Sequence, residues 1–218
     1  MIIERQVGGV LAHFALEGEV EAVAPVAEGH INRSWIVTLR AGSATASSPR
    51  PGRYLLQRIN EGVFLQPERV MQNVAHVTRH LVDAVRRAGL PEPERRALRL
   101  VPTRDGKPYH RDADGGVWRV YPFIAGAKTR EHVRTPDRAR EVGRAFGAFQ
   151  RLLADYDGPR LLETIPHFHD TARRLEGLDR AIAADRLGRT KTAVHEIGAT
   201  LVHRDLAHVL PPLLASGD

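Results

Sequence analysis

Short apolar segments separated by tight turns fill the first 124 residues and are interrupted by one long helical pattern. Asp105-Gly106 is a strong hairpin-turn signal between the segments 98–103 and 107–110, and Asp114-Gly115-Gly116 marks a second turn. Further strands are expected at 20–23, 35–39, 54–59 and 117–124. From these six segments we predict an antiparallel sheet to which five strands contribute.

Helical patterns surround and follow these strands. Apolar residues at 3, 7, 11 and 14 predict an opening helix. Pro67 is suited to the first turn of a long helix that ends at Gly89, with one apolar stripe: Val70, Val74, Val77, Leu81 and Val85. After residue 125 the pattern becomes helical, with caps predicted at Thr135 and Asp170 and a last helix at about 191–210. The predicted class is therefore α+β.

Composition restricts the function only loosely. The chain has 218 residues, no Cys and a formal net charge of +6. It contains no apolar run of the ~20 residues that a membrane helix needs and no signal-peptide layout, so we expect a cytoplasmic protein without a membrane partner. The charge favours anionic ligands in general. Aromatic residues make up only 6%, with no nucleic-acid-binding motif, so a nucleic-acid partner is not expected.

Six blocks of sequence resemble the aminoglycoside phosphotransferase and choline kinase superfamily, in particular its N-acetylhexosamine 1-kinases. These blocks are Gly29-His30-Ile31-Asn32, Tyr54-Leu55-Leu56-Gln57-Arg58-Ile59-Asn60, Val70-Met71-Gln72-Asn73, Trp118-Arg119-Val120-Tyr121, 145–153 and 164–171. The resemblance implies a protein-kinase-like fold with a β-rich nucleotide-binding lobe at 1–124. A hinge at 125–128 and a partial helical lobe at 129–218 would follow.

The resemblance also implies ATP- and Mg²⁺-dependent phosphoryl transfer to the anomeric hydroxyl of an N-acetylhexosamine. Gly29 would allow a tight turn whose backbone amides approach the phosphates. The other cofactor-binding residues expected on this basis are His30, Asn32, Ser34, Arg58, Pro122, Phe123 and Ile124. The last three would form the hinge that meets adenine.

The cation that reaches the phosphates is expected on the third strand. Strand alternation puts Arg58 on the face of Tyr54 and Leu56, and Gln57 on the opposite face. Arg58 is the first choice, and Gln57 takes the role if the register differs by one residue. The resemblance also calls for a Glu at position 72 of the long helix, but the residue there is Gln72, and the nearest carboxylate is Glu68.

The letters His203-Arg204-Asp205-Leu206 match the catalytic loop of protein kinases. We expect the match to be coincidental, because Leu210 stands where a metal-binding Asn is needed and a helical pattern surrounds it. His167 and His169 do not indicate a metal site either, since Asp170 is placed as a helix cap. The sequence therefore offers no catalytic residue and no metal ligand.

In the resembled family the catalytic loop and the metal-binding carboxylate follow the segment that ends this chain. We expect the 218-residue chain by itself to transfer no phosphate, as a fragment, a frameshifted product or a complete module. The alternative function is a non-catalytic, pseudokinase-like nucleotide-binding module. Without the remaining lobe, apolar side chains such as Phe146, Phe149 and Leu153 are expected to be exposed.

Overall fold

The computed structural model describes residues 2–16, 18–27, 29, 31–40, 52–127, 132–209 and 212, with side chains from residue 6. Within these ranges the chain forms two compact units, Met1–Thr164 and Ile165–Asp218. Helix α4 belongs to the unit that contains the sheet, and the lobe bounds and hinge expected from the sequence stay a prediction. No described helix is long and apolar enough to cross a membrane.

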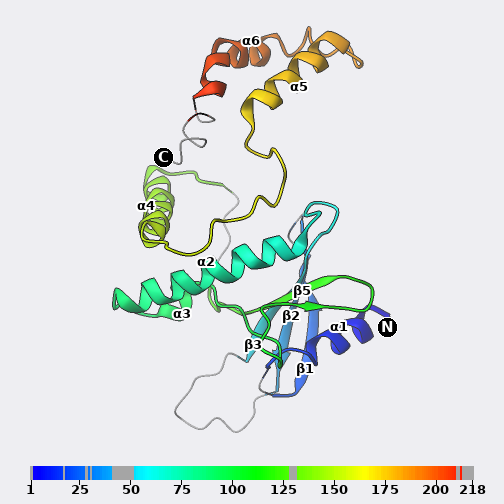
Figure 1. Cartoon of the computed structure of the whole chain (residues 1–218), viewed down its shortest axis with the longest axis vertical. Helices are drawn as coiled ribbons and strands as arrows, with labels where there is room; N and C mark the ends of the chain where they lie inside the picture. The colour runs from blue at the N-terminus through cyan, green and yellow to red at the C-terminus, as the bar shows by residue number, and fades with distance from the viewer. Residues whose placement is uncertain are drawn as a thin grey trace. The chain divides into compact units, whose positions relative to one another are not determined.

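The first unit contains an antiparallel five-stranded sheet and four helices (Figure 1). Its strands are β1 (Val20–Pro25), β2 (Arg33–Leu39), β3 (Arg53–Arg58), β4 (His110–Arg111) and β5 (Val117–Pro122). They are ordered β1-β2-β3-β5-β4, and the chain between β3 and β4 contains α2. The predicted α+β class with a five-stranded antiparallel sheet is thus confirmed.

The two faces of the sheet carry different residues. Cross-strand partners share a face, so Trp35, Leu56 and Val120 lie together on one side, and Ile36, Leu55 and Tyr121 on the other. The first side packs on helix α1 (Ile2–Leu11), and we call it the α1 face. The opposite side, where Met71 of α2 packs against Val117, is the α2 face.

The main core lies between α1 and the α1 face. Val7, Val10, Leu11 and Phe14 from the N-terminal segment pack against buried strand residues there: Trp35, Val37, Leu39, Tyr54, Leu56, Trp118 and Val120. Phe14, Val37, Leu56 and Val120 are fully inaccessible to solvent. Gly8 and Gly9 do not interrupt α1, because tertiary packing outweighs the roughly 1 kcal/mol that each Gly costs in a helix.

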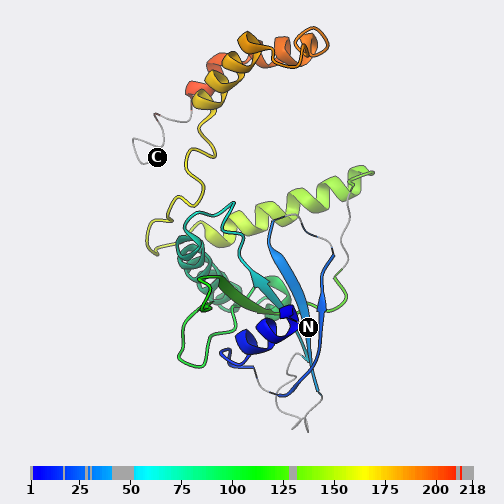
Figure 2. The same ribbon diagram turned by 90° about the vertical axis from the view of Figure 1, so that its right-hand side faces the viewer.

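Helix α2 (Pro67–Arg87) begins at the predicted proline and lies across the sheet (Figure 1). Its C-terminal half also contacts α4 (Pro136–Leu153), which Thr135 caps by accepting a hydrogen bond from the Arg138 amide. Only one end of α4 meets α2, and the rest extends away from it (Figure 2). Leu153 packs against the Leu81 and Val85 cluster, whereas Phe146 (67% exposed) and Phe149 (45%) are exposed. The expected exposure is therefore confirmed for the two Phe residues and wrong for Leu153.

The strand predicted at 98–103 does not form. α3 (Pro93–Arg96) precedes it, and this segment makes only isolated bridges, Phe14 with Thr103 and Val101 with Val120. Asp105-Gly106 does make a tight turn, in which the Thr103 amide donates to the Lys107 carbonyl. The hairpin that this part of the chain adds to the sheet is instead the next one, from β4 through the Asp112–Gly116 turn to β5.

The second unit is helical, with α5 (Thr171–Ala184), α6 (Val194–Val202) and the 3₁₀ helix η1 (Arg204–His208). Asp170 caps α5 as predicted, since its Oδ1 accepts a hydrogen bond from the Arg173 amide at 3.0 Å. The continuous helix predicted at 191–210 was wrong, because the chain changes to η1 at Arg204. Among the described residues of this unit, only Ala207 is a buried hydrophobic residue.

Candidate functional site

The connection between β1 and β2 contains Gly29, which the sequence predicted to allow a tight turn. Gly29 has φ +118°, a conformation that costs glycine little and strains other residues. Asn32 fixes the end of this turn, because its Oδ1 accepts a hydrogen bond from the Asn60 amide just after β3, at 3.0 Å. His30, the third residue predicted here, lies outside the described residues.

A chain of polar side chains crosses the α2 face next to that turn. Gln57 Nε2 donates to Ser34 Oγ at 3.0 Å, and Arg119 Nε donates to Gln57 Oε1 at 3.1 Å. The three residues are cross-strand neighbours on β2, β3 and β5. Each is only partly buried, so these groups border an accessible part of the sheet face.

Arg58 lies on the opposite side, on the α1 face. Its guanidinium lies 5.8 Å from the centre of the Trp118 ring and fills the space above Gly116, where a Cβ would come within 2.7 Å of Arg58 Nε. The structure therefore separates Arg58 from Ser34, and brings Gln57 next to Ser34. The role of Arg58 at the phosphates stays a prediction.

Asp112 is the anionic neighbour of Arg58. Its carboxylate accepts hydrogen bonds from Trp118 Nε1 and from the Gly116 amide, both at 2.7 Å. Partial burial acts to raise the pKa of Asp112, but these two hydrogen bonds and the charge of Arg58 outweigh it and hold the pKa below its ordinary value. The carboxylate is thus ionised at neutral pH.

The predicted hinge residues Pro122, Phe123 and Ile124 lie together at the far end of β5. The Phe123 amide donates to the Arg53 carbonyl, and the Arg53 guanidinium stacks on the Phe123 ring at 4.2 Å. All three residues also line a cavity of about 360 Å³ formed with α2, α3 and the segment after α3. Its other lining residues are Val82, Arg86, Pro93, Glu94, Arg95, Ala97, Leu98, Arg99 and Ala125.

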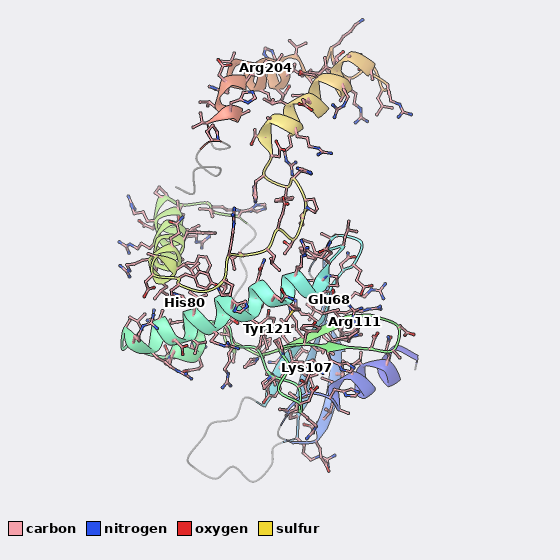
Figure 3. The ribbon with its side chains drawn as sticks, in the orientation of Figure 1. Glu68, His80, Lys107, Arg111, Tyr121 and Arg204 are labelled. Atoms are coloured by element: carbon pink, nitrogen blue, oxygen red, sulfur yellow. The ribbon has the colours of Figure 1, made fainter. Side chains whose placement is uncertain are left out.

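Helix α2 does not carry the carboxylate that the resemblance calls for at position 72. Gln72 is exposed, and Glu68 forms an ion pair with Arg111 of β4 (Figure 3). The α2 side chain that meets the polar chain is Met71, whose Sδ lies 4.0 Å from Arg119 Nη1. Figure 3 shows Tyr121, the next residue of β5 on this face, beneath α2. Burial raises the pKa of its phenol, so Tyr121 is neutral at physiological pH.

The His-Arg-Asp letters belong to η1 in the second unit. Arg204 makes two hydrogen bonds to the Asp179 carboxylate of α5, at 2.6 and 2.9 Å. The hydrogen bonds from Arg204 lower the pKa of Asp179 below its ordinary value. This segment thus has a structural contact of its own, in which Arg204 joins η1 to α5.

Among the described residues, no three His, Asp or Glu side chains lie close enough together to hold a metal ion. His167 Nδ1 lies 3.5 Å from Asp170 Oδ2, within the cap of α5.

The sequence model of the phosphotransferase enzyme family matches residues 22–217 of this chain. The match includes both the sheet with its polar chain and the helices that follow. The chain therefore belongs to this phosphotransferase family, whose members are kinase-type enzymes acting on small molecules.

Arg119 is the residue of this site that the sequence reasoning did not select. The signal was present, because a charged residue stands between Trp118 and Val120 in an otherwise apolar strand. A half-buried Arg in such a strand needs a partner or a function. Alternation alone could not show that its partner is Gln57.

Proposed function

We propose that this chain binds ATP on the α2 face of the sheet and belongs to a cytoplasmic enzyme that phosphorylates a sugar. The acceptor proposed is the anomeric hydroxyl of an N-acetylhexosamine, on the basis of the six resembling sequence blocks. One observation carries the nucleotide site: the polar chain of Ser34, Gln57 and Arg119 begins beside the Gly29 turn. A phosphotransferase needs such donors for the phosphate oxygens.

The nucleotide would extend along the sheet from the hinge to the turn. Its adenine would lie near 122–124, and its phosphates near the Gly29 turn, Asn32 and Ser34. Arg119 and Pro122 are three residues apart on β5, or about 10 Å, which separates the two ends of the ligand. Between them Ile36 and Leu55 offer half-buried apolar side chains on which the base and ribose could rest.

Phosphoryl transfer depends on positioning the γ-phosphate and offsetting its charge, usually with Mg²⁺. We assign the described residues only the binding and orientation of the nucleotide. The second candidate function is nucleotide binding without transfer.

The site can be tested by placing a carboxylate on the α2 face. Leu55→Glu would put a negative charge on the surface where the base and ribose would rest, and we expect it to abolish ATP binding measured by calorimetry. Leu65→Glu is the matched control, since Leu65 is 74% exposed and lies in the loop before α2. Equal ATP affinity in both variants, at unchanged melting temperature, would place the nucleotide elsewhere.

The acceptor is tested by incubating the chain with ATP and a panel of sugars, followed by mass spectrometry of the products. Phosphorylated N-acetylglucosamine or N-acetylgalactosamine would support the sugar kinase. Saturable ATP binding with no phosphorylated sugar above blank would favour the non-catalytic module. Phosphorylation of another acceptor would keep the family function and refute the sugar.

A further inference from the structure

We propose that Arg119 on β5, held by Gln57, is the cation that contacts the nucleotide phosphates. This inference rests on the proposed function and changes its key contact. The sequence suggested that the cation would come from β3, through Arg58. The structure instead supplies a guanidinium from the neighbouring strand, on the face that carries Ser34.

The position of Arg119 follows from the strand register. Gln57 pairs with Ser34 on one side and with Arg119 on the other, so the three side chains line up across the sheet. Ser34 is the second residue of β2, which begins just after the Gly29 turn. Arg119 therefore lies at the turn end of the sheet, whereas Pro122 marks the hinge end of the same strand.

The charge of Arg119 also points to an anionic ligand. Within the described residues, the ion pairs do not include Arg119, although its side chain is partly buried. Glu68, the carboxylate of α2 nearest in sequence to position 72, forms an ion pair with Arg111. A partly desolvated cation without an anionic partner is stabilised when a phosphate supplies the missing charge.

Its neighbours hold the guanidinium in one orientation. Gln57 Oε1 accepts from Nε, Met71 Sδ lies 4.0 Å from Nη1, and the Tyr121 ring centre is 5.2 Å from Cζ. A guanidinium has five N–H donors, more than these contacts use. Preorganised donors of this kind match the oxygens of a phosphate, and less entropy is lost when the ligand binds.

Arg58 is in the opposite situation. Asp112 is its charged neighbour, Trp118 lies under it, and Gly116 leaves room for it in the β4–β5 turn. These contacts stabilise the α1 face and turn Arg58 away from Ser34. Replacing Arg119 is therefore expected to change mainly ATP affinity, whereas replacing Arg58 is expected to change mainly stability.

The experiment measures ATP and adenosine affinities of the 218-residue chain by calorimetry, for the wild type and for Arg119→Gln, Arg119→Lys and Arg58→Gln. We expect Arg119→Gln to weaken ATP binding about tenfold or more while adenosine affinity is unchanged, because only phosphate contacts are lost. Arg119→Lys should be intermediate, since the charge remains but the planar fork is lost. Arg58→Gln should lower the melting temperature more than the ATP affinity. Arg40→Gln is the charge-matched control, because Arg40 is exposed and pairs with Glu19.

Each outcome decides the proposal. Wild-type affinity for ATP in both Arg119 variants would overturn it while leaving the proposed function intact. Weaker ATP binding with unchanged adenosine binding in Arg58→Gln alone would also overturn the proposal while leaving the proposed function intact. The phosphate contact would then belong to Arg58 on β3. A wild-type chain that binds neither ATP nor adenosine would refute both the proposed function and this inference. If Arg119→Gln does not fold, Arg119→Lys decides alone: weaker ATP binding with unchanged adenosine binding supports the proposal.

Discussion

Leu55 and Leu56 are neighbours on β3, but they lie in different environments. Leu56 is fully buried on the α1 face, within the largest apolar cluster of the described residues, whereas Leu55 is half-buried on the α2 face. The same contrast separates Arg58, packed beside Trp118 and Asp112, from Arg119, which ends a polar chain. One face of the sheet is thus closed by α1, and the other keeps partly buried polar side chains.

The largest effect is expected from truncating the two leucines in turn. Leu56→Ala should lower the free energy of unfolding by about 2–5 kcal/mol, because it leaves a cavity in a closed core. Leu55→Ala is the matched control and should cost about 1 kcal/mol, since less apolar area is lost. Tryptophan fluorescence in a urea titration reports on this unit alone, because both Trp residues of the chain, Trp35 and Trp118, lie in it. Equal losses would show that the two faces do not differ as described.

A smaller loss is expected from removing the carboxylate beneath Arg58. Asp112→Ala would leave Trp118 Nε1 and the Gly116 amide without their acceptor, at a cost of about 1–3 kcal/mol in the same titration. Asp114→Ala in the same turn is the control, because Asp114 is exposed and its contact with Gln6 is 3.5 Å long. A loss in Asp114→Ala as large as in Asp112→Ala would contradict the assignment.

The pH dependence of the α1 face gives a finer test. The pKa of Asp112 is lower in the folded chain than its ordinary value of 3.8. Its contribution to stability is therefore present above pH 3.8 and is lost as the pH falls through the folded value. Urea titrations at several acidic pH values should show a steeper loss for the wild type than for Asp112→Asn. Parallel pH profiles would mean that Asp112 does not titrate differently on folding.

The smallest effect is expected for a solvent-exposed ion pair in the second unit. Arg204 and Asp179 have side chains that are 43% and 44% exposed, so solvent screens their attraction. Asp179→Ala should leave helicity and its thermal transition, followed by circular dichroism, almost unchanged. A large loss of helicity would show that this pair, unlike a surface ion pair, holds α5 and η1 together.

Several elements could be predicted because their signals are local. Pro67 starts α2, Thr135 caps α4 and Asp170 caps α5, as each residue type favours through its own backbone or side chain. Alternation also placed Arg58 and Gln57 on opposite faces correctly. The strand predicted at 98–103 did not form, because strand formation needs a partner over several residues. β4 pairs with the Val117–Trp118 end of β5, and Val101 makes only a single bridge to Val120.

The sequence by itself determined the order of the elements, the antiparallel sheet and the Gly29 turn, since these follow from short-range periodicity and backbone preference. Only the tertiary structure decided which face of the sheet α1 would close and which would keep accessible polar groups. That choice depends on packing between residues far apart in the chain, such as Leu56 with α1 and Arg119 with Met71 of α2. For the same reason the pairing of Glu68 with Arg111, and of Arg119 with Gln57, could not be read from spacing: each contact joins strands or helices that only the folded core brings together.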